Sequence, residues 1–197
     1  MVLSKVVTPP FLLHAEFRFN EKKATQVAAL LIQLRGSQKM KYLKLLKLVY
    51  LIDRESLARW GRPLSTDRHV SMDKGPVPSR IYNLITEEQL KSGVWSAHIQ
   101  TVPGYDVQLL SDPGNDELSQ AEDDLIREVF QMHGHKNRWR LVEELHQVPE
   151  WRDPDGSMIP ISIRDILTAV GKTPDEISEI ERQIEADVFA DSVLQPV

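Results

Sequence analysis

The amino-acid sequence predicts a mainly α-helical, compact domain with one small β-hairpin. Three observations lead to this prediction. Apolar residues recur at helical spacing along most of the chain, several helix starts carry a capping pair, and strand-like alternation is confined to one stretch. The chain has 197 residues, 41% of them hydrophobic, and this is enough for one buried core without disulfide or metal support.

The first half of the chain contains two well-marked helices. Asn20 is placed to cap a helix whose apolar residues end at Gly36. A second helix is expected over about 40–60, with Gly61 as its stop. Because the centre of this second helix is apolar almost all round, we expect it to be the most enclosed helix of the domain.

The middle of the chain combines loops with short extended segments. Residues 63–74 are expected to form a loop with a short strand over 69–72. Two prolines in the stretch 75–78 fix the backbone before another helix, since proline sets φ and disfavours α geometry at the residue before it. Alternating apolar residues over 95–110, with a Pro-Gly turn midway, predict the hairpin.

The second half returns to helical patterns. A hydroxyl residue followed three positions later by an acid marks three helix starts: Ser119 with Glu122, Ser162 with Asp165, and Thr173 with Glu176. Asn137 is placed to cap a short helix that carries Trp139, Val142 and Leu145. We therefore divide the chain into an N-terminal extension (1–18), a domain (19–170) and an acidic C-terminal helix and tail (171–197).

Composition excludes several classes of protein. The net charge is −5, which disfavours a nucleic-acid binder, and the absence of cysteine removes thiol nucleophiles, disulfides and cysteine-based zinc sites. The longest apolar run, Val27–Ile32, is far shorter than the roughly 20 residues that cross a bilayer. We expect no membrane segment and a cytoplasmic location.

No pattern in the sequence carries a recognisable catalytic site. Histidines and acids are concentrated over 133–146, but they lack the His-Glu-x-x-His spacing that places two imidazoles on one helix face. The chain has no Gly-x-Ser-x-Gly nucleophile turn and no glycine-rich phosphate loop. We expect no enzyme activity, no cofactor and no metal.

Charge is distributed unevenly along the chain. Four lysines between positions 39 and 47 have no acid among them, whereas the tracts 112–124 and 173–191 are strongly acidic. Such runs are often only solvated helix faces. The alternative is that the lysine face attracts an acidic partner while the C-terminal helix attracts a basic one.

An ordered set of short motifs leads to a family. The set comprises FNEKKATQ at 19–26, KLLKLVYLID at 44–53, GRPL at 61–64, KGPVP at 74–78 with Ile81-Tyr82, and later the blocks 118–129 and 141–146 with Trp151. In this order the motifs resemble the Panacea domain of the SocA-like antitoxins, over residues 19–170. The resemblance implies a non-enzymatic protein that neutralises a toxin, usually encoded next to it, by direct binding.

The resemblance and the charge pattern together suggest where a partner binds. We expect the toxin to contact the lysine helix and the loop 68–80, with these candidate residues: Lys44, Lys47, Tyr50, Arg54, Arg68, His69, Lys74, Arg80 and Tyr82. We expect Gly75, Pro76 and Val77 to fix the turn as a structural motif. Tyr50 and Tyr82 have an alternative role as core aromatics, and Arg54 has one in local helix pairs.

Other functions stay open at this point. The lysine helix could serve a DNA-binding regulator, although the net charge makes DNA binding unlikely. One member of the family resembles a protease adaptor that presents its toxin for degradation, so a cellular protease is a further candidate partner. A hydrolase comes last. The extension 1–18, rich in apolar residues, is expected to pack on the domain or to await a partner.

Overall fold

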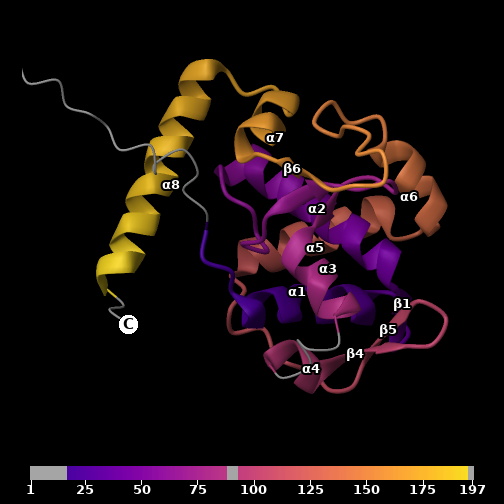
Figure 1. The fold of residues 1–197 in the computed structure, drawn as a ribbon. Coiled ribbons are helices and arrows are strands. Elements are labelled where there is room, and N and C mark those ends of the chain that lie inside the picture. The colour runs from indigo at the N-terminus through magenta and orange to yellow at the C-terminus, as the bar shows by residue number, and fades with distance from the viewer. Residues whose placement is uncertain (1–16, 88–92, 195–197) are drawn as a thin grey trace, which may run out of the picture.

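The computed structural model describes residues 17–87 and 93–194, and eight helices and six short strands follow one another within them (Figure 1). The elements are α1 (Glu21–Leu34), β1 (Lys39–Lys41), α2 (Tyr42–Trp60), β2 (His69–Ser71), β3 (Val77–Pro78), α3 (Ser79–Thr86), α4 (Val94–His98), β4 (Ile99–Val102), β5 (Asp106–Leu109), α5 (Gln120–His133), α6 (Arg138–Leu145), β6 (Ile159–Ile161), α7 (Ile163–Ala169) and α8 (Pro174–Leu194). The mainly helical fold class is confirmed. Most of the predicted extension, up to residue 16, lies outside the described residues.

The predicted helix ends are formed by the expected residues. The Asn20 side chain accepts a hydrogen bond from the backbone N–H of Lys23 and so caps α1. Gly61 ends α2 in the left-handed conformation, with φ of 71°. The start of α2 differs from the prediction, because Lys39–Lys41 pairs with β5 as a strand and the helix begins only at Tyr42.

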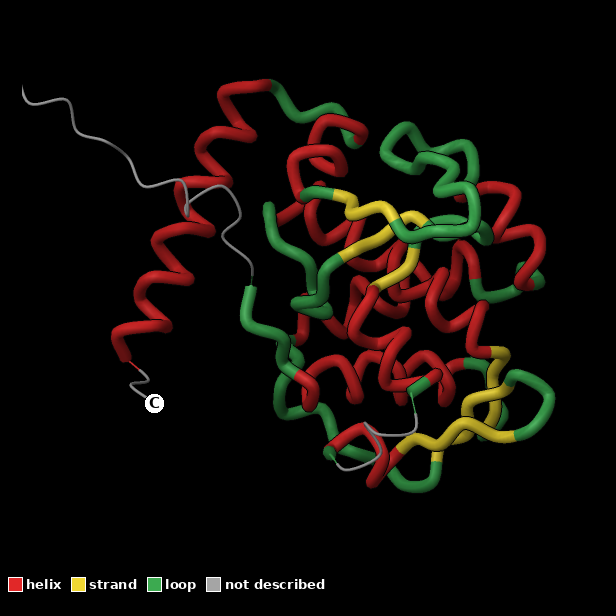
Figure 2. The backbone as a smooth tube through the Cα atoms, viewed as in Figure 1, coloured by secondary structure: helices red, strands yellow, loops and turns green. Residues whose placement is uncertain are grey.

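The strands form two small antiparallel sheets, visible as two separate yellow patches in Figure 2. One sheet has the order β1-β5-β4, with Met40 opposite Val107. The predicted hairpin is its β4–β5 pair, but residues 94–98 before it are helical, not extended. The other sheet has the order β3-β2-β6, and β6 carried no signal in the sequence analysis.

The core is built around α2, which is the most enclosed helix as expected. Ten of its residues are buried, from Leu45 to Leu57, and α1, α5 and α6 pack against it. A second apolar cluster joins Tyr50 and Leu57 to α7 and to Ile177 at the start of α8. Helix α2 therefore contributes to both clusters. Its buried polar side chains must form hydrogen bonds with other groups of the protein.

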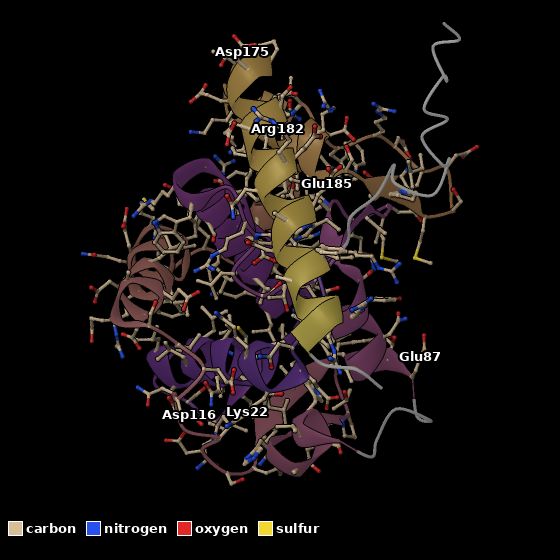
Figure 3. All side chains as sticks on the ribbon, turned by 90° about the vertical axis from the view of Figure 1, so that its left-hand side faces the viewer. Lys22, Glu87, Asp116, Asp175, Arg182 and Glu185 are labelled. Carbon is tan, nitrogen blue, oxygen red and sulfur yellow. The ribbon has the colours of Figure 1, made fainter. Side chains whose placement is uncertain are left out.

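Helix α8 lies along one side of the molecule, opposite α6 and β1 (Figure 1). Ile177 and Ile184 are buried, and Ile180 lies against Gly61. Asp175, Arg182 and Glu185 lie along this helix (Figure 3), where the acidic residues extend along the solvent side. None of the described helices is both long enough and apolar enough to cross a membrane.

Candidate partner-binding surface and the buried motif beneath it

Lys47 is buried in the middle of the domain. Its side chain is fully enclosed, and its Nζ donates a hydrogen bond of 2.7 Å to the carbonyl oxygen of Pro76. Burial lowers the pKa of Lys47 to about 7, because the charged ammonium loses its hydration. This placement corrects the expectation that Lys47 lies on an exposed lysine face.

The Gly75-Pro76-Val77 turn closes over Lys47. Gly75 has φ of +86°, and a β-carbon there would lie 3.2 Å from Lys47 Nζ and 3.3 Å from His146 Cδ2. Val77 is 2% exposed. The position therefore needs glycine for two reasons, the left-handed backbone and the close approach of two side chains. The structure is consistent with the structural role expected for this motif.

His146 and Trp151 also contact the segment that forms this turn. Their rings stack with centroids 4.2 Å apart, and Trp151 Nε1 donates to the carbonyl oxygen of Met72. His146 Nε2 is buried and has no hydrogen-bond partner among the described residues. The end of α6 is thereby tied to the loop before Gly75.

Tyr50 and Arg54 share one buried acid. The Tyr50 hydroxyl and the Arg54 Nε each donate 2.7 Å hydrogen bonds to Oε1 of Glu150, whose side chain is fully enclosed. Burial, followed by the Glu150 charge, raises the pKa of Tyr50. Tyr50 is itself 0% exposed, so its side chain belongs to the core and contributes no surface. Arg54 keeps a quarter of its side chain exposed.

Asp53, His69 and Ser65 form a second buried polar group. Asp53 accepts hydrogen bonds from the Ser65 N–H and hydroxyl and lies 2.9 Å from His69 Nε2. These are the residue types of a nucleophilic triad, but a triad needs the imidazole between the hydroxyl and the carboxylate. Here the carboxylate is in the middle, and all three residues are buried. The group therefore joins α2 to β2 and to the loop before it.

The remaining candidates lie around the start of α3. Asp67 accepts from the backbone N–H groups of Arg80 and Ile81, and burial raises the pKa of Asp67 against the lowering effect of these bonds. The Arg80 guanidinium lies 5.4 Å from the Phe19 ring centroid. Tyr82 is half-buried against the core, and Arg68 is exposed. Of these side chains, Arg68 presents the most surface.

A basic groove of about 470 Å³ lies between β1, the start of α2 and the start of α6. It is lined by five cations, Arg35, Lys41, Lys44, Lys136 and Arg138, together with His135, Asn137 and Trp139. Lys41 pairs with Asp106 and Lys136 with Glu144. Lys44, the one member of the predicted set that lines this groove, donates to the carbonyl oxygen of Gly134.

Trp139 forms one wall of the groove and is 49% exposed. The guanidinium of Arg138 lies 5.1 Å from its ring centroid and the Nζ of Lys74 lies 5.8 Å from it. Our sequence analysis placed Trp139 among the apolar residues of its helix and missed this role. The signal was the stretch 136–140, KNRWR, in which an aromatic residue stands among three basic ones.

Several acids of the tract 112–124 pair with basic residues of the same domain. Lys22 of α1 pairs with Asp116, and the two side chains lie together in Figure 3. Lys23 pairs with Glu122, whose carboxylate also accepts from Ser119 in the capping box. Within the described residues, no three His, Asp or Glu side chains are grouped as they would be for a metal ion.

The fold and this surface define a small helical protein with a basic groove next to the hydrogen-bonded turn at Gly75. A family model described as antitoxin SocA-like, Panacea domain, matches residues 45–152, more than half of the chain. The chain therefore belongs to the SocA-like antitoxin family. The match runs from α2 through α6 and includes the buried turn and the Trp139 side of the groove. No curated protein and no solved structure matches the chain.

Proposed function

We propose that this protein is a cytoplasmic antitoxin that neutralises a cognate toxin protein by binding it directly, without enzymatic chemistry. The family match over residues 45–152 is the observation that carries the proposal. The toxin is expected to be the product of the neighbouring gene. Binding neutralises it either by covering its active surface or by presenting it to a cellular protease.

The arrangement of the polar groups supports a binding role. The buried ionisable residues of α2, such as Lys47 and Asp53, are bonded to backbone or side-chain groups that hold neighbouring segments in place. The exposed polar residues instead form a charged surface with an aromatic side chain at its edge. An interface of this composition is typical of protein recognition, in which Trp and Arg often supply the strongest contacts.

A growth test examines the function directly. The neighbouring gene is induced alone and together with this chain, and growth is followed after induction. Growth arrest that co-expression relieves is the expected result, and co-purification of the two proteins shows direct binding. A neighbouring gene that causes no arrest, together with the absence of any co-purifying protein from the native host, contradicts the proposal.

Two further measurements separate the modes of neutralisation. If the toxin persists at the same level while growth recovers, the antitoxin masks it. If the toxin level falls, and this fall requires a cellular protease, the chain acts as an adaptor. Binding to the promoter of its own operon, tested over a range of salt concentrations, examines the DNA-binding alternative, since phosphate contacts weaken steeply as salt rises.

A further inference from the structure

The basic groove contains more positive charge than its own acids neutralise. Arg35 and Lys44 donate to the carbonyl oxygens of Lys39 and Gly134, and Arg138 lies against Trp139. Among the described residues, none of these three has a carboxylate within ion-pair distance, whereas Lys41 and Lys136 do. Burial, followed by the nearby Arg35 charge, lowers the pKa of Lys44.

The backbone adds to this positive potential. Helix α6 begins at the groove, because its cap residue Asn137 and its first residues, Arg138 and Trp139, line it, so the positive end of the helix dipole lies there. The Asn137 side chain caps two of these groups, from Trp139 and Arg140, so the helix start is rigid. A negatively charged group placed in the groove would therefore gain from both the side chains and the helix end.

Exposed aromatic rings stand beside the charges. Trp139 is 49% exposed in the groove, and Tyr105 is 74% exposed at the tip of the β4–β5 hairpin, where the carbonyl oxygen of Gly104 accepts from Lys41. An aromatic ring flanked by cations is a frequent centre of protein interfaces. Both rings are presented by segments tied to the body of the domain, so little ordering is required when a partner binds.

The charge of the surroundings limits what the groove can hold. Asp106 and Glu144 pair with the groove residues Lys41 and Lys136, Glu143 pairs with Arg140, and the protein as a whole carries a net charge of −5. A long polyanion such as duplex DNA would have to continue from the groove past these carboxylates. A short acidic segment fits both the small volume and the restricted extent of the positive charge.

We propose that the groove between β1, the start of α2 and the start of α6 is the docking site for a short, carboxylate-rich segment of the cognate toxin, with Trp139 as its apolar anchor. This inference rests on the proposed antitoxin function and adds the surface that binds and the chemistry of the bound segment. Arg35, Lys44 and Arg138 pair with carboxylates of the toxin. Trp139 packs against an apolar part of the same segment.

The test uses the full chain and the purified neighbouring toxin. The double variant Arg35→Glu/Arg138→Glu reverses two groove charges, and a glutamate in the first turn of α6 suits the helix dipole, so folding is preserved. The matched control, Arg164→Glu/Arg182→Glu, makes the same change in net charge on exposed residues of α7 and α8. Trp139→Ala removes the aromatic anchor, and thermal melting confirms that each variant is folded.

The expected result is a toxin dissociation constant roughly tenfold or more above wild type for the groove double variant, mainly through slower association. Trp139→Ala is expected to weaken binding by a similar factor, mainly through faster dissociation. The control keeps the wild-type affinity. The salt dependence of association should also be smaller for the groove variant than for the control.

The possible results distinguish a failure of the docking site from a failure of the antitoxin function. If wild type binds the toxin and both groove variants bind it as tightly as the control, the docking site is wrong and the antitoxin function stands. If wild type binds no toxin and relieves no arrest, the function fails and the docking site with it. If the groove variants lose binding to a single-stranded RNA or a duplex DNA but keep toxin binding, the groove serves nucleic acid and the proposal is overturned.

Discussion

Replacing Lys47 with methionine should change how the stability of the protein depends on pH. In the folded protein burial lowers the pKa of Lys47 to about 7, against 10.5 for an ordinary lysine. Between these values the unfolded chain binds more protons than the folded one, so the stability of wild type should rise with pH. Over pH 7.5 to 9.5 this one group contributes a rise on the order of 2 to 3 kcal/mol.

The Lys47→Met variant has no such group. The free energy of unfolding of wild type should therefore rise by that amount relative to that of the variant over this pH range. At pH 7.5 the variant avoids the cost of releasing the lysine proton on folding, but it leaves the Pro76 carbonyl oxygen without its donor, which costs roughly 1 to 3 kcal/mol. Denaturant unfolding of both proteins at a series of pH values measures the difference, because all other titrating groups cancel.

Exposed Lys39, changed to methionine, is the matched control for the loss of a surface lysine. Its profile should run parallel to that of wild type between pH 7.5 and 9.5. Parallel profiles for Lys47→Met as well would refute the reasoning, since they would mean that Lys47 is as well hydrated in the folded protein as in the unfolded chain.

Three further substitutions test the buried contacts. Gly75→Ala should destabilise the fold by roughly 1 to 3 kcal/mol, because it strains a left-handed residue and crowds Lys47; a melting temperature equal to wild type would contradict this. Tyr50→Phe should cost about 1 to 2 kcal/mol in denaturant unfolding, since Glu150 loses a buried donor, and no loss would show that the bond is not formed. Asp53→Ala should cost more, roughly 3 kcal/mol or above, by stranding three buried donors, and wild-type stability would exclude that network.

Local signals were sufficient for most helix ends. The Asn20 cap, the Ser119 capping box and the left-handed Gly61 all depend on residues within a few positions of one another, so they can be read from the sequence. The extended hairpin was likewise found from its alternation and its turn. The strand Lys39–Lys41 was missed because its only signal is distant: its hydrogen-bond partners lie in β5.

The fates of the lysines could not be predicted for the same reason. Lys44 and Lys47 are three residues apart on α2 and point in directions only roughly 60° apart. Spacing alone therefore predicts one common face. What separates them is tertiary: the turn at Gly75 covers Lys47, whereas Lys44 reaches the carbonyl of Gly134 beside an open groove. The contact of Lys47 spans about 30 residues of chain and that of Lys44 spans 90, and contacts between such distant residues produce no periodic pattern in the sequence.

The buried turn and the surface groove are connected by a single residue. Lys74 directly precedes Gly75, and its Nζ lies 5.8 Å from the Trp139 ring centroid. The hydrogen bond from buried Lys47 to the Pro76 carbonyl oxygen holds the turn in place. It therefore also fixes the backbone position from which the Lys74 side chain extends toward Trp139. Deforming the turn should therefore weaken toxin binding through Trp139, even though none of the buried residues reaches the surface. Gly75→Ala examines this link, with Tyr50→Phe as a control that is also destabilised in the buried core. A loss of toxin affinity clearly greater for Gly75→Ala than for Tyr50→Phe would show that the turn positions the groove.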